Sequence, residues 1–199
     1  MNVPLLTLLL AIPTVGGVLC LFMHPTNGRG VRALAFTFAF ATMVAAIPLY
    51  TGFDGTSAAY QFQESHEWIP SLGATYHVGV DGISLFLVLL SVVLTPLALL
   101  ASWKSVDRRV REFMAALLFL EAAMIGVFVS LDLFLFYVFW EAMLIPMYLL
   151  IAVWGGPDRR YAAMKFILYT IVGSLLMLVA ILYLYSASGT GSFDLPGIL

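Results

Sequence analysis

The chain has 199 residues, of which 62% are hydrophobic and 10% charged, and its formal net charge is −2. Soluble domains carry about 25% charged residues, so this composition excludes an ordinary soluble protein and indicates helices that cross a membrane. Cys20 has no partner for an intrachain disulfide. The sequence contains no metal-ligand spacing, no nucleotide-binding or nucleophile motif, and nothing that indicates nucleic-acid binding.

Six apolar runs are long enough to cross the roughly 30 Å hydrocarbon core of a bilayer. In chain order they cover about residues 3–23, 31–51, 81–103, 112–130, 133–154 and 161–185. Prolines inside the first, third and fifth runs should bend those helices. The sequence therefore predicts an all-α polytopic membrane protein with six transmembrane helices.

The second and third predicted helices are joined by a long polar connection at residues 52–80. It contains Asp54, Glu64 and Glu67 but no Lys or Arg, and its aromatic residues suit a membrane interface. We expect a short interfacial helix at about residues 64–70. The three histidines, His24, His66 and His77, fall in predicted loops, where we expect them to be solvated.

The last two connections are short or polar. Leu131 and Asp132 form a minimal turn, so the fourth and fifth predicted helices must be antiparallel neighbours. The residues from 186 to 192 are small and polar, and we expect them to form a flexible exit from the sixth helix.

Basic residues fall only at alternate connections. The nine Lys and Arg residues follow the first, third and fifth predicted helices, whereas the connections after the second, fourth and sixth helices carry only acids. Cytoplasmic loops are enriched in Lys and Arg. We therefore expect both ends of the chain to face away from the cytoplasm. The basic turn at residues 104–111 should be a solvated topogenic turn, or should meet anionic lipid or a partner subunit.

Two carboxylates lie inside apolar runs. Glu141 falls in the fifth predicted helix and Glu121 in the fourth, and both are near the membrane midplane. A charge at that depth costs about 2.5–3.5 kcal/mol on insertion scales, so such a residue is by default a candidate ion or proton site. We take Glu141 as the first candidate for proton translocation and Glu121 as a possible second. A structural ion pair or hydrogen bond is the alternative role for each.

The face of the fifth helix around Glu141 offers possible supporting groups. Tyr137 and Tyr148 share its helical stripe, and their hydroxyls could bind the carboxylate or hold water, or the rings could be interface or packing aromatics. Pro146 removes a backbone hydrogen bond and should open the helix nearby. Burial disfavours the charged carboxylate and a nearby cation would restore it, so alternation between these states would load and release a proton.

Other residues in the helices suit anchoring and packing. Lys165 should anchor the sixth helix at the cytoplasmic surface, with proton uptake as the alternative role. Two stripes of small residues should let helices approach closely. They consist of Ala122, Gly126 and Ser130 on the fourth helix, and of Thr170, Gly173 and Ser174 on the sixth.

Residues 137–148, with Trp140-Glu141-Ala142-Met143-Leu144-Ile145-Pro146 at their centre, resemble a known family. It is chain M of the bacterial proton-pumping NADH-quinone oxidoreductase (respiratory complex I), whose mitochondrial relative is NADH dehydrogenase chain 4. Further matching stretches are residues 68–70, 76–85, 94–103, 165–170 and 173–174. The resemblance covers nearly the whole chain.

The resemblance implies a proton-translocating subunit of a translocase that couples NADH oxidation and quinone reduction to proton pumping. In the family motif the Glu is a key proton-translocation residue, and Glu141 occupies its position. The resemblance implies no redox centre on this chain; NADH, FMN, iron-sulfur clusters and quinone are expected on other subunits. Expected partners are other membrane-arm subunits, including antiporter-like neighbours, and the lipid of a bacterial inner (cell) membrane.

The resemblance also divides the chain. Residues 1–111 would be three lead-in helices with the acidic extracytoplasmic loop at 52–80. Residues 112–185 would be helices four to six, which start the proton-translocating antiporter-like repeat, and residues 186–199 an extracytoplasmic tail.

The family has more helices than this sequence, arranged as inverted repeats, and the lysines that pair with its Glu lie beyond the sixth helix. We therefore expect a truncated chain, or partner helices from another polypeptide, and no complete proton half-channel from these residues alone. Two other functions stay open. The chain could belong to a multi-subunit cation/proton antiporter, or it could be a structural fragment that only scaffolds a membrane arm.

Overall fold

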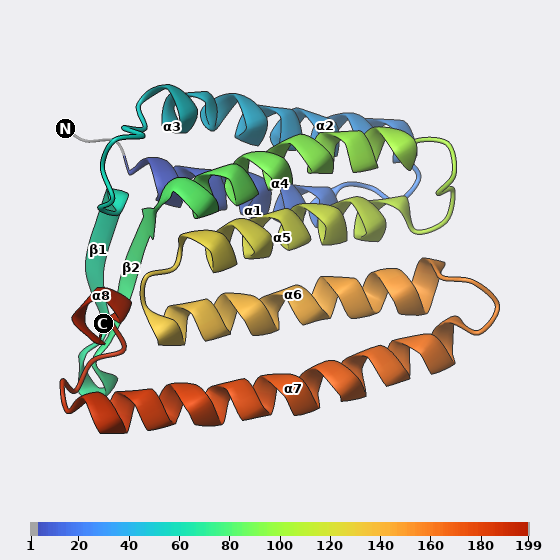
Figure 1. Cartoon of the computed structure of the whole chain (residues 1–199). Helices are drawn as coiled ribbons and strands as arrows, with labels where there is room; N and C mark the ends of the chain where they lie inside the picture. Colours follow the sequence, from blue (N-terminus) through green and yellow to red (C-terminus); the bar gives the residue numbers. More distant parts are fainter. Residues whose placement is uncertain (1–3, 199) are drawn as a thin grey trace.

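The computed structural model describes residues 4–198, and six of its helical segments are long and apolar enough to cross a membrane. They lie side by side, nearly parallel or antiparallel (Figure 1). The segments are α1 (Leu5–Phe22), α2 (Gly28–Ala45) continued by the short α3 (Ile47–Thr51), α4 (Gly82–Ala101), α5 (Val110–Val129), α6 (Leu133–Trp154) and α7 (Arg159–Ser188). The chain is a multi-pass membrane protein.

The predicted helices agree with the structure in number and order. The bounds of α6 are those expected, and the other helices differ from prediction by a few residues at their ends, where hydropathy gives way to capping. The expected first residue of the first helix, Val3, lies outside the described residues. Helices α1, α4 and α6 continue unbroken through Pro13, Pro96 and Pro146.

Helix α5 forms the centre of the structure. It contacts α1, α2 and α4, with which it makes a four-helix bundle, and α6 on another side, while α7 packs on α6. In the membrane-spanning stretch of α5, 61% of the residues are buried, whereas in that of α7 only 11% are. Two apolar clusters fill the bundle, one around Leu9 and Ile125 and the other around Leu99 and Leu118. The division of the chain at residue 111 stays a prediction.

The polar connection after α3 is a β-hairpin, so the predicted interfacial helix at residues 64–70 is wrong. Strand β1 (Gln61–Ile69) pairs antiparallel with β2 (Ala74–Val80) through the short 3₁₀ turn η1 (Pro70–Leu72). Gly73 closes the turn with φ of 67°, in the left-handed region that glycine occupies without strain. A partner strand lies within reach of this segment, and pairing with it satisfies more backbone groups than one isolated helical turn would.

The tail after α7 is ordered on the hairpin, so the prediction of a flexible exit is wrong. Phe193 is buried and its ring stacks on Tyr185, with 4.3 Å between centroids. Its backbone N–H donates to the Gly73 carbonyl at 3.3 Å, and α8 (Leu195–Ile198) follows. Leu199 lies outside the described residues. The buried aromatic ring supplies the apolar contact that a polar, glycine-rich tail needs to become ordered.

The prediction of a solvated His77 is also wrong. Its Nδ1 lies 2.5 Å from Asp194 Oδ1 in the tail, and its Nε2 lies 3.1 Å from Gln63 Oε1 in β1. The side chain of His77 is 12% exposed. His77 therefore joins the hairpin to the segment that follows α7. By contrast, His24 and His66 are exposed.

Three acids lie at the end of the bundle that carries the hairpin, which we call the acidic end, and they cap helices that begin there. Glu64 in β1 accepts from the backbone N–H groups of Leu6 and Thr7 at the start of α1, at 2.7 and 3.1 Å. Asp81 caps α4 in a reciprocal capping box with Ser84, and the backbone N–H of Ser84 holds the pKa of Asp81 below its ordinary value. A carboxylate is stabilised at a helix N-terminus by free N–H groups and the helix dipole.

Asp132 is the most highly coordinated of these caps. Its side chain is completely buried. Oδ1 accepts from the backbone N–H groups of Phe134 and Leu135 at 2.9 and 3.0 Å, and Oδ2 accepts from the N–H and hydroxyl of Thr75 in β2 at 2.9 and 3.0 Å. One carboxylate thus fixes the start of α6 and ties it to the hairpin.

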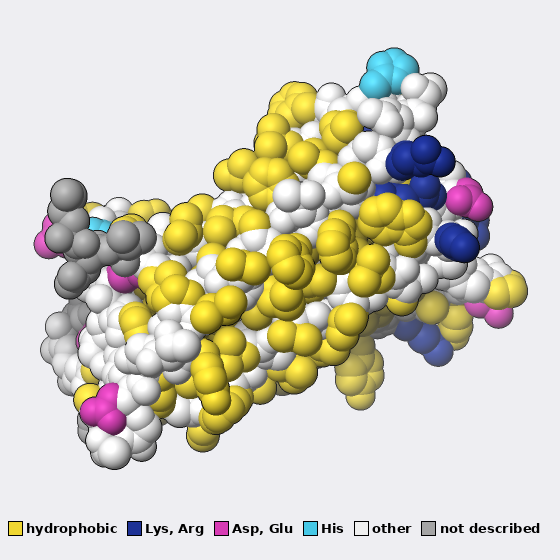
Figure 2. Space-filling model, turned by 90° about the horizontal axis from the view of Figure 1, so that it is seen from above, with side chains coloured by type: hydrophobic (Ala, Val, Ile, Leu, Met, Phe, Trp, Pro, Cys, Tyr) yellow, Lys and Arg dark blue, Asp and Glu magenta, His cyan; other side chains and the backbone are white. Residues whose placement is uncertain are grey.

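The opposite end of the bundle carries the basic residues. Figure 2 shows a broad hydrophobic face with Lys and Arg gathered at one end of it. Helices α2, α5 and α7 begin at this end, and neither Arg109 nor Asp158, the N-cap residues of α5 and α7, makes a side-chain cap hydrogen bond. The charge asymmetry seen in the sequence is therefore a property of the two ends of the folded bundle.

We predict that Asp132→Ala destabilises the protein strongly. The substitution leaves buried donors without an acceptor, at a cost of about 1–3 kcal/mol for each group that stays unsatisfied. Thermal unfolding in detergent should show a lower midpoint, and proteolysis should cut the hairpin faster. Asp158→Ala is the matched control, because Asp158 is an exposed N-cap residue without a cap hydrogen bond. Equal effects of the two substitutions would contradict the assignment.

Candidate functional site

Glu121 and Glu141 lie at the same depth on neighbouring antiparallel helices. Each is eight residues from the turn that joins α5 to α6, which places both about 12 Å from the acidic end at a rise of 1.5 Å per residue. The structure brings the two helices together as predicted. Their side chains nevertheless lie on different sides of the α5–α6 contact.

Glu121 faces the interior of the four-helix bundle. It is 0% exposed, and neither carboxyl oxygen has a hydrogen-bond partner among residues 4–198. It shares a stripe of α5 with Leu118 and Ile125, which pack into the clusters formed with α1, α2 and α4. An acid that is enclosed without donors contributes nothing evident to stability, because an unsatisfied buried polar group is costly.

Glu141 faces α7. Its Oε1 is enclosed and has no hydrogen-bond partner among the described residues. Tyr137, one turn earlier, lies within electrostatic reach of the Glu141 carboxyl and of the Ser174 hydroxyl on α7. The Tyr137 ring also belongs to the apolar cluster of Ile181 on α7. A carboxyl, a phenol and a hydroxyl therefore gather between α6 and α7, and such groups can exchange a proton or bind water.

The remaining predicted site residues lie farther from Glu141. Tyr148 is half-buried on the same stripe but about 10 Å further along the helix. Pro146 is buried on another face of α6, towards α1 and α5. Lys165 is exposed near the start of α7, with its Nζ 4.5 Å from the centre of the Tyr161 ring. It lies roughly 10 Å closer to the basic end than Glu141, so it cannot pair with that carboxylate directly.

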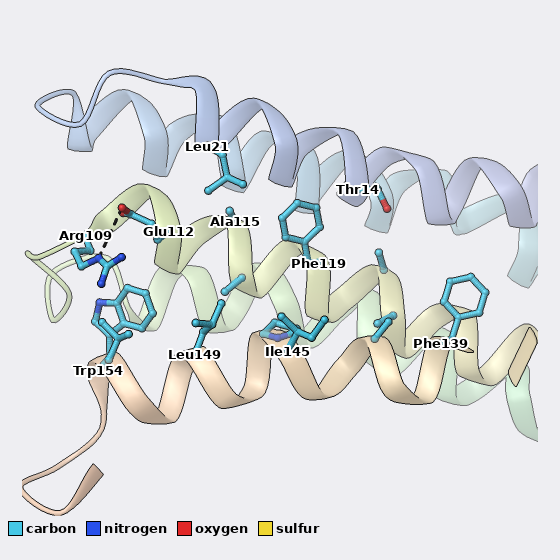
Figure 3. Close-up of a pocket in the computed structure, with 16 residues that line it drawn as sticks. Thr14, Leu21, Arg109, Glu112, Ala115, Phe119, Phe139, Ile145, Leu149 and Trp154 are labelled. Carbon is cyan, nitrogen blue, oxygen red and sulfur yellow. Dashed lines mark ion pairs between the residues drawn. The ribbon is translucent and has the colours of Figure 1, made fainter. Parts of the chain in front are cut away.

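A face of α6 beside that of Glu141 borders a groove against α1 and α5 (Figure 3). Its volume is about 480 Å³. Ala122 and Ala142, neighbours in sequence of the two acids, line its wall. The groove therefore runs close to both acidic residues, and neither Glu121 nor Glu141 lines it.

The small-residue stripes have different roles. A Cβ on Gly126 would overlap the ring of Phe139, so glycine at this position permits the close contact of α5 and α6. A Cβ on Gly173 would meet nothing within 4 Å. Ser174 is buried, whereas Gly173 is exposed. The stripe on α5 thus serves helix packing, while that on α7 is largely open.

Sequence reasoning missed the roles of Asp132, Glu64 and His77. An Asp directly before an apolar run is an N-cap signal, so the cap of α6 could have been recognised. Glu64 caps α1 over a separation of 57 or 58 residues, and His77 binds Asp194 over 117 residues. No local sequence pattern predicts such long-range contacts. No cluster of three or more His, Cys, Asp or Glu side chains suited to a metal occurs within residues 4–198.

Two family models match the chain. The model described as NADH-ubiquinone oxidoreductase chain 4, amino terminus, matches residues 6–127. The model described as NADH:quinone oxidoreductase/Mrp antiporter, TM, matches residues 130–196. The two matches meet at the turn between α5 and α6.

Relatives of known name are similar over most of the chain. NADH-quinone oxidoreductase subunit M of Rhodobacter capsulatus is 48% identical over 86% of this chain and 34% of the relative. F(420)H(2) dehydrogenase subunit M of Methanosarcina mazei is 38% identical over 98% of this chain and 40% of the relative. The chain thus spans between a third and two-fifths of the length of these two relatives.

A solved structure shares the fold. A chain of respiratory complex I from Thermus thermophilus with bound NADH superposes with a TM-score of 0.83 and is 31% identical in sequence. The match covers 97% of this chain and 38% of that chain.

We predict that Glu121→Leu raises the stability of the protein. The substitution removes a buried acid without hydrogen bonds and replaces it by an apolar side chain, which should gain about 1–3 kcal/mol. The midpoint of thermal unfolding in detergent should rise. Glu112→Leu serves as the control, since Glu112 pairs with Arg111 at 3.4 Å and its loss should not stabilise. A lower midpoint for Glu121→Leu would reveal that Glu121 has a structural role.

Proposed function

The chain belongs to the NADH-ubiquinone oxidoreductase chain 4 family, and from that membership we propose that it is a proton-translocating membrane subunit of NADH:quinone oxidoreductase. In this role it couples NADH oxidation and quinone reduction elsewhere in the complex to proton movement across the membrane. The proposal rests above all on Glu141, a mid-membrane carboxyl with an enclosed, unpartnered oxygen.

Glu141 is the proton-carrying group of the proposal. A carboxyl group with one oxygen that lacks a hydrogen-bond donor can take up a proton, and an approaching cation favours its release. The side chains of Tyr137 and Ser174 lie with that of Glu141 between α6 and α7. Their hydroxyl groups can pass a proton to the Glu141 carboxyl directly or through water. Glu121 is a second proton site in this proposal, placed on the other side of α5.

The cation that switches Glu141 comes from outside residues 4–198. All nine Lys and Arg residues of the chain fall in the connections at the basic end or close to them. Lys165 is among them, and it serves as an anchor at the membrane surface. We propose that lysines on additional helices of the assembled complex approach Glu141 from the open side of α6 and α7.

The surroundings of the chain follow from the same proposal. The protein resides in a bacterial inner membrane with its basic end in the cytoplasm and both ends of the chain outside. Its partners are other membrane-arm subunits, including antiporter-like neighbours. The chain carries no redox centre, and NADH, FMN, iron-sulfur clusters and quinone bind other subunits. Relatives named for NADH and for F(420)H(2) are both similar to it, which supports a role that does not depend on the electron donor.

A second candidate is a subunit of a multi-subunit cation/proton antiporter. The model that matches residues 130–196 is described for both oxidoreductase and Mrp antiporter proteins, and this part of the chain contains Glu141. Co-purification with NADH dehydrogenase activity supports the first function, whereas sodium-dependent transport without that activity supports the second. A scaffold role predicts that neither activity depends on Glu141.

We predict that Glu141→Gln abolishes proton pumping by the assembled complex without preventing assembly. Glutamine has nearly the same shape but cannot carry a proton. Pumping should be measured as acidification in reconstituted vesicles driven by NADH oxidation, and assembly by co-purification of the other subunits. Glu141→Asp should keep part of the activity, and Glu112→Gln, at the basic end, should keep nearly all of it. Unchanged pumping in Glu141→Gln would refute the role of Glu141.

A further inference from the structure

The groove between α1, α5 and α6 has the character of an amphipathic binding site. Along α6 its lining runs from Phe139 to Trp154, a distance of about 22 Å at 1.5 Å per residue. Small and aliphatic side chains form its walls, among them Ala115, Ala116, Ile145 and Leu149. Charged side chains line only the end near Trp154, where Arg109 and Glu112 stand (Figure 3).

The charged end of the groove attracts anions. Residues 104–112 contain four basic and two acidic side chains, which leaves a net charge of +2. The neighbouring arginines are already engaged with backbone carbonyls. Arg108 donates to the carbonyl of Val153 at 2.7 Å, and Arg32 to that of Val106 at 2.7 Å.

Arg109 is the basic side chain left available at the mouth of the groove. Its side chain is 60% exposed, and its one charged partner among the described residues is Glu112, with Nε 3.7 Å from Oε1. Its backbone has φ of 52°, a conformation that L-residues other than Asn and Asp seldom adopt. The side chain of Arg109 lines the groove (Figure 3), where its terminal nitrogens can donate to an anion.

We propose that this groove binds an anionic phospholipid, whose phosphate contacts Arg109 and one of whose acyl chains lies between α1, α5 and α6. The groove is longer than the depth of one leaflet, about half of the roughly 30 Å hydrocarbon core, so it can hold the whole of an acyl chain that enters at its charged end. The Trp154 indole donates to the Arg108 carbonyl at 2.9 Å, which holds the ring at the level of the headgroup.

A transmembrane helix fits this space less well than a lipid. A helix is about 10 Å or more in diameter, so a stretch of the same length would exceed the volume of the groove. Such a helix could pack across the opening of the groove but could not enter it fully. A lipid chain would fill the groove and would keep water from the contact of α5 with α6. The proposal requires only that the protein lies in a membrane.

Photolabelling tests the proposal on the full chain in lipid nanodiscs. Phosphatidylglycerol with a photoreactive group in one acyl chain is compared with phosphatidylcholine that carries the same chain. Labelled residues are then located by mass spectrometry. We expect phosphatidylglycerol to label Ile145 and Leu149 about fivefold more than phosphatidylcholine does, in keeping with the attraction of one basic residue for an anionic lipid. Leu176, exposed on α7, should be labelled equally by both lipids.

Substitutions separate a specific site from general attraction. Arg109→Gln should remove the preference for phosphatidylglycerol at Ile145 and Leu149, and Arg109→Lys should restore part of it. Arg160→Gln is the matched control, an exposed arginine at the same end that does not line the groove. The proposal is overturned if both lipids label the groove equally, if Arg160→Gln has the effect of Arg109→Gln, or if the groove stays unlabelled because a helix covers it.

Discussion

The hydrogen bonds of Asp132 hold together the acidic end of the protein. A completely buried carboxylate is tolerated only when its oxygens are well supplied with donors, and Asp132 accepts four hydrogen bonds from α6 and β2. Backbone contacts then extend from this point: Leu131 donates to the His77 carbonyl, and Leu133 to that of Phe193. The hairpin, the α5–α6 turn and the segment after α7 thereby become one unit, which fixes the position of the first turn of α6 relative to the hairpin.

The buried acids differ in their supply of hydrogen bonds, and this difference separates structural from functional candidates. Asp132 has four donors, whereas both oxygens of Glu121 and one of Glu141 have none among the described residues. A buried carboxyl group whose two oxygens both accept hydrogen bonds is held in one position, which suits a structural role. A carboxyl group with an oxygen that lacks a hydrogen-bond donor can bind a cation or a proton that arrives. Because α5 separates Glu121 from the side of Glu141, the two acids meet different neighbours.

Much of the fold could be predicted from the sequence, because helix length and charge asymmetry are local properties. The bounds of α6 and the antiparallel turn at Asp132 follow directly from hydropathy and chain length. The hairpin could not be predicted, since β1 is stabilised by β2 and not by its own sequence. The directions of Glu121 and Glu141 also escaped prediction, because helix rotation is set by packing such as that of Gly126 on Phe139. The functional roles of both acids stay predictions.

Glu64 imposes an order on the biogenesis of the protein. It caps the first turn of α1 from β1, and the Thr7 hydroxyl bonds to both Glu64 and Tyr76. The N-terminus of α1 therefore lacks its acceptor until the chain has been synthesised past α2 and the hairpin has crossed to the same side of the membrane. The first helix to be inserted is thus completed only after the second helix has crossed the membrane and the hairpin has reached the start of α1.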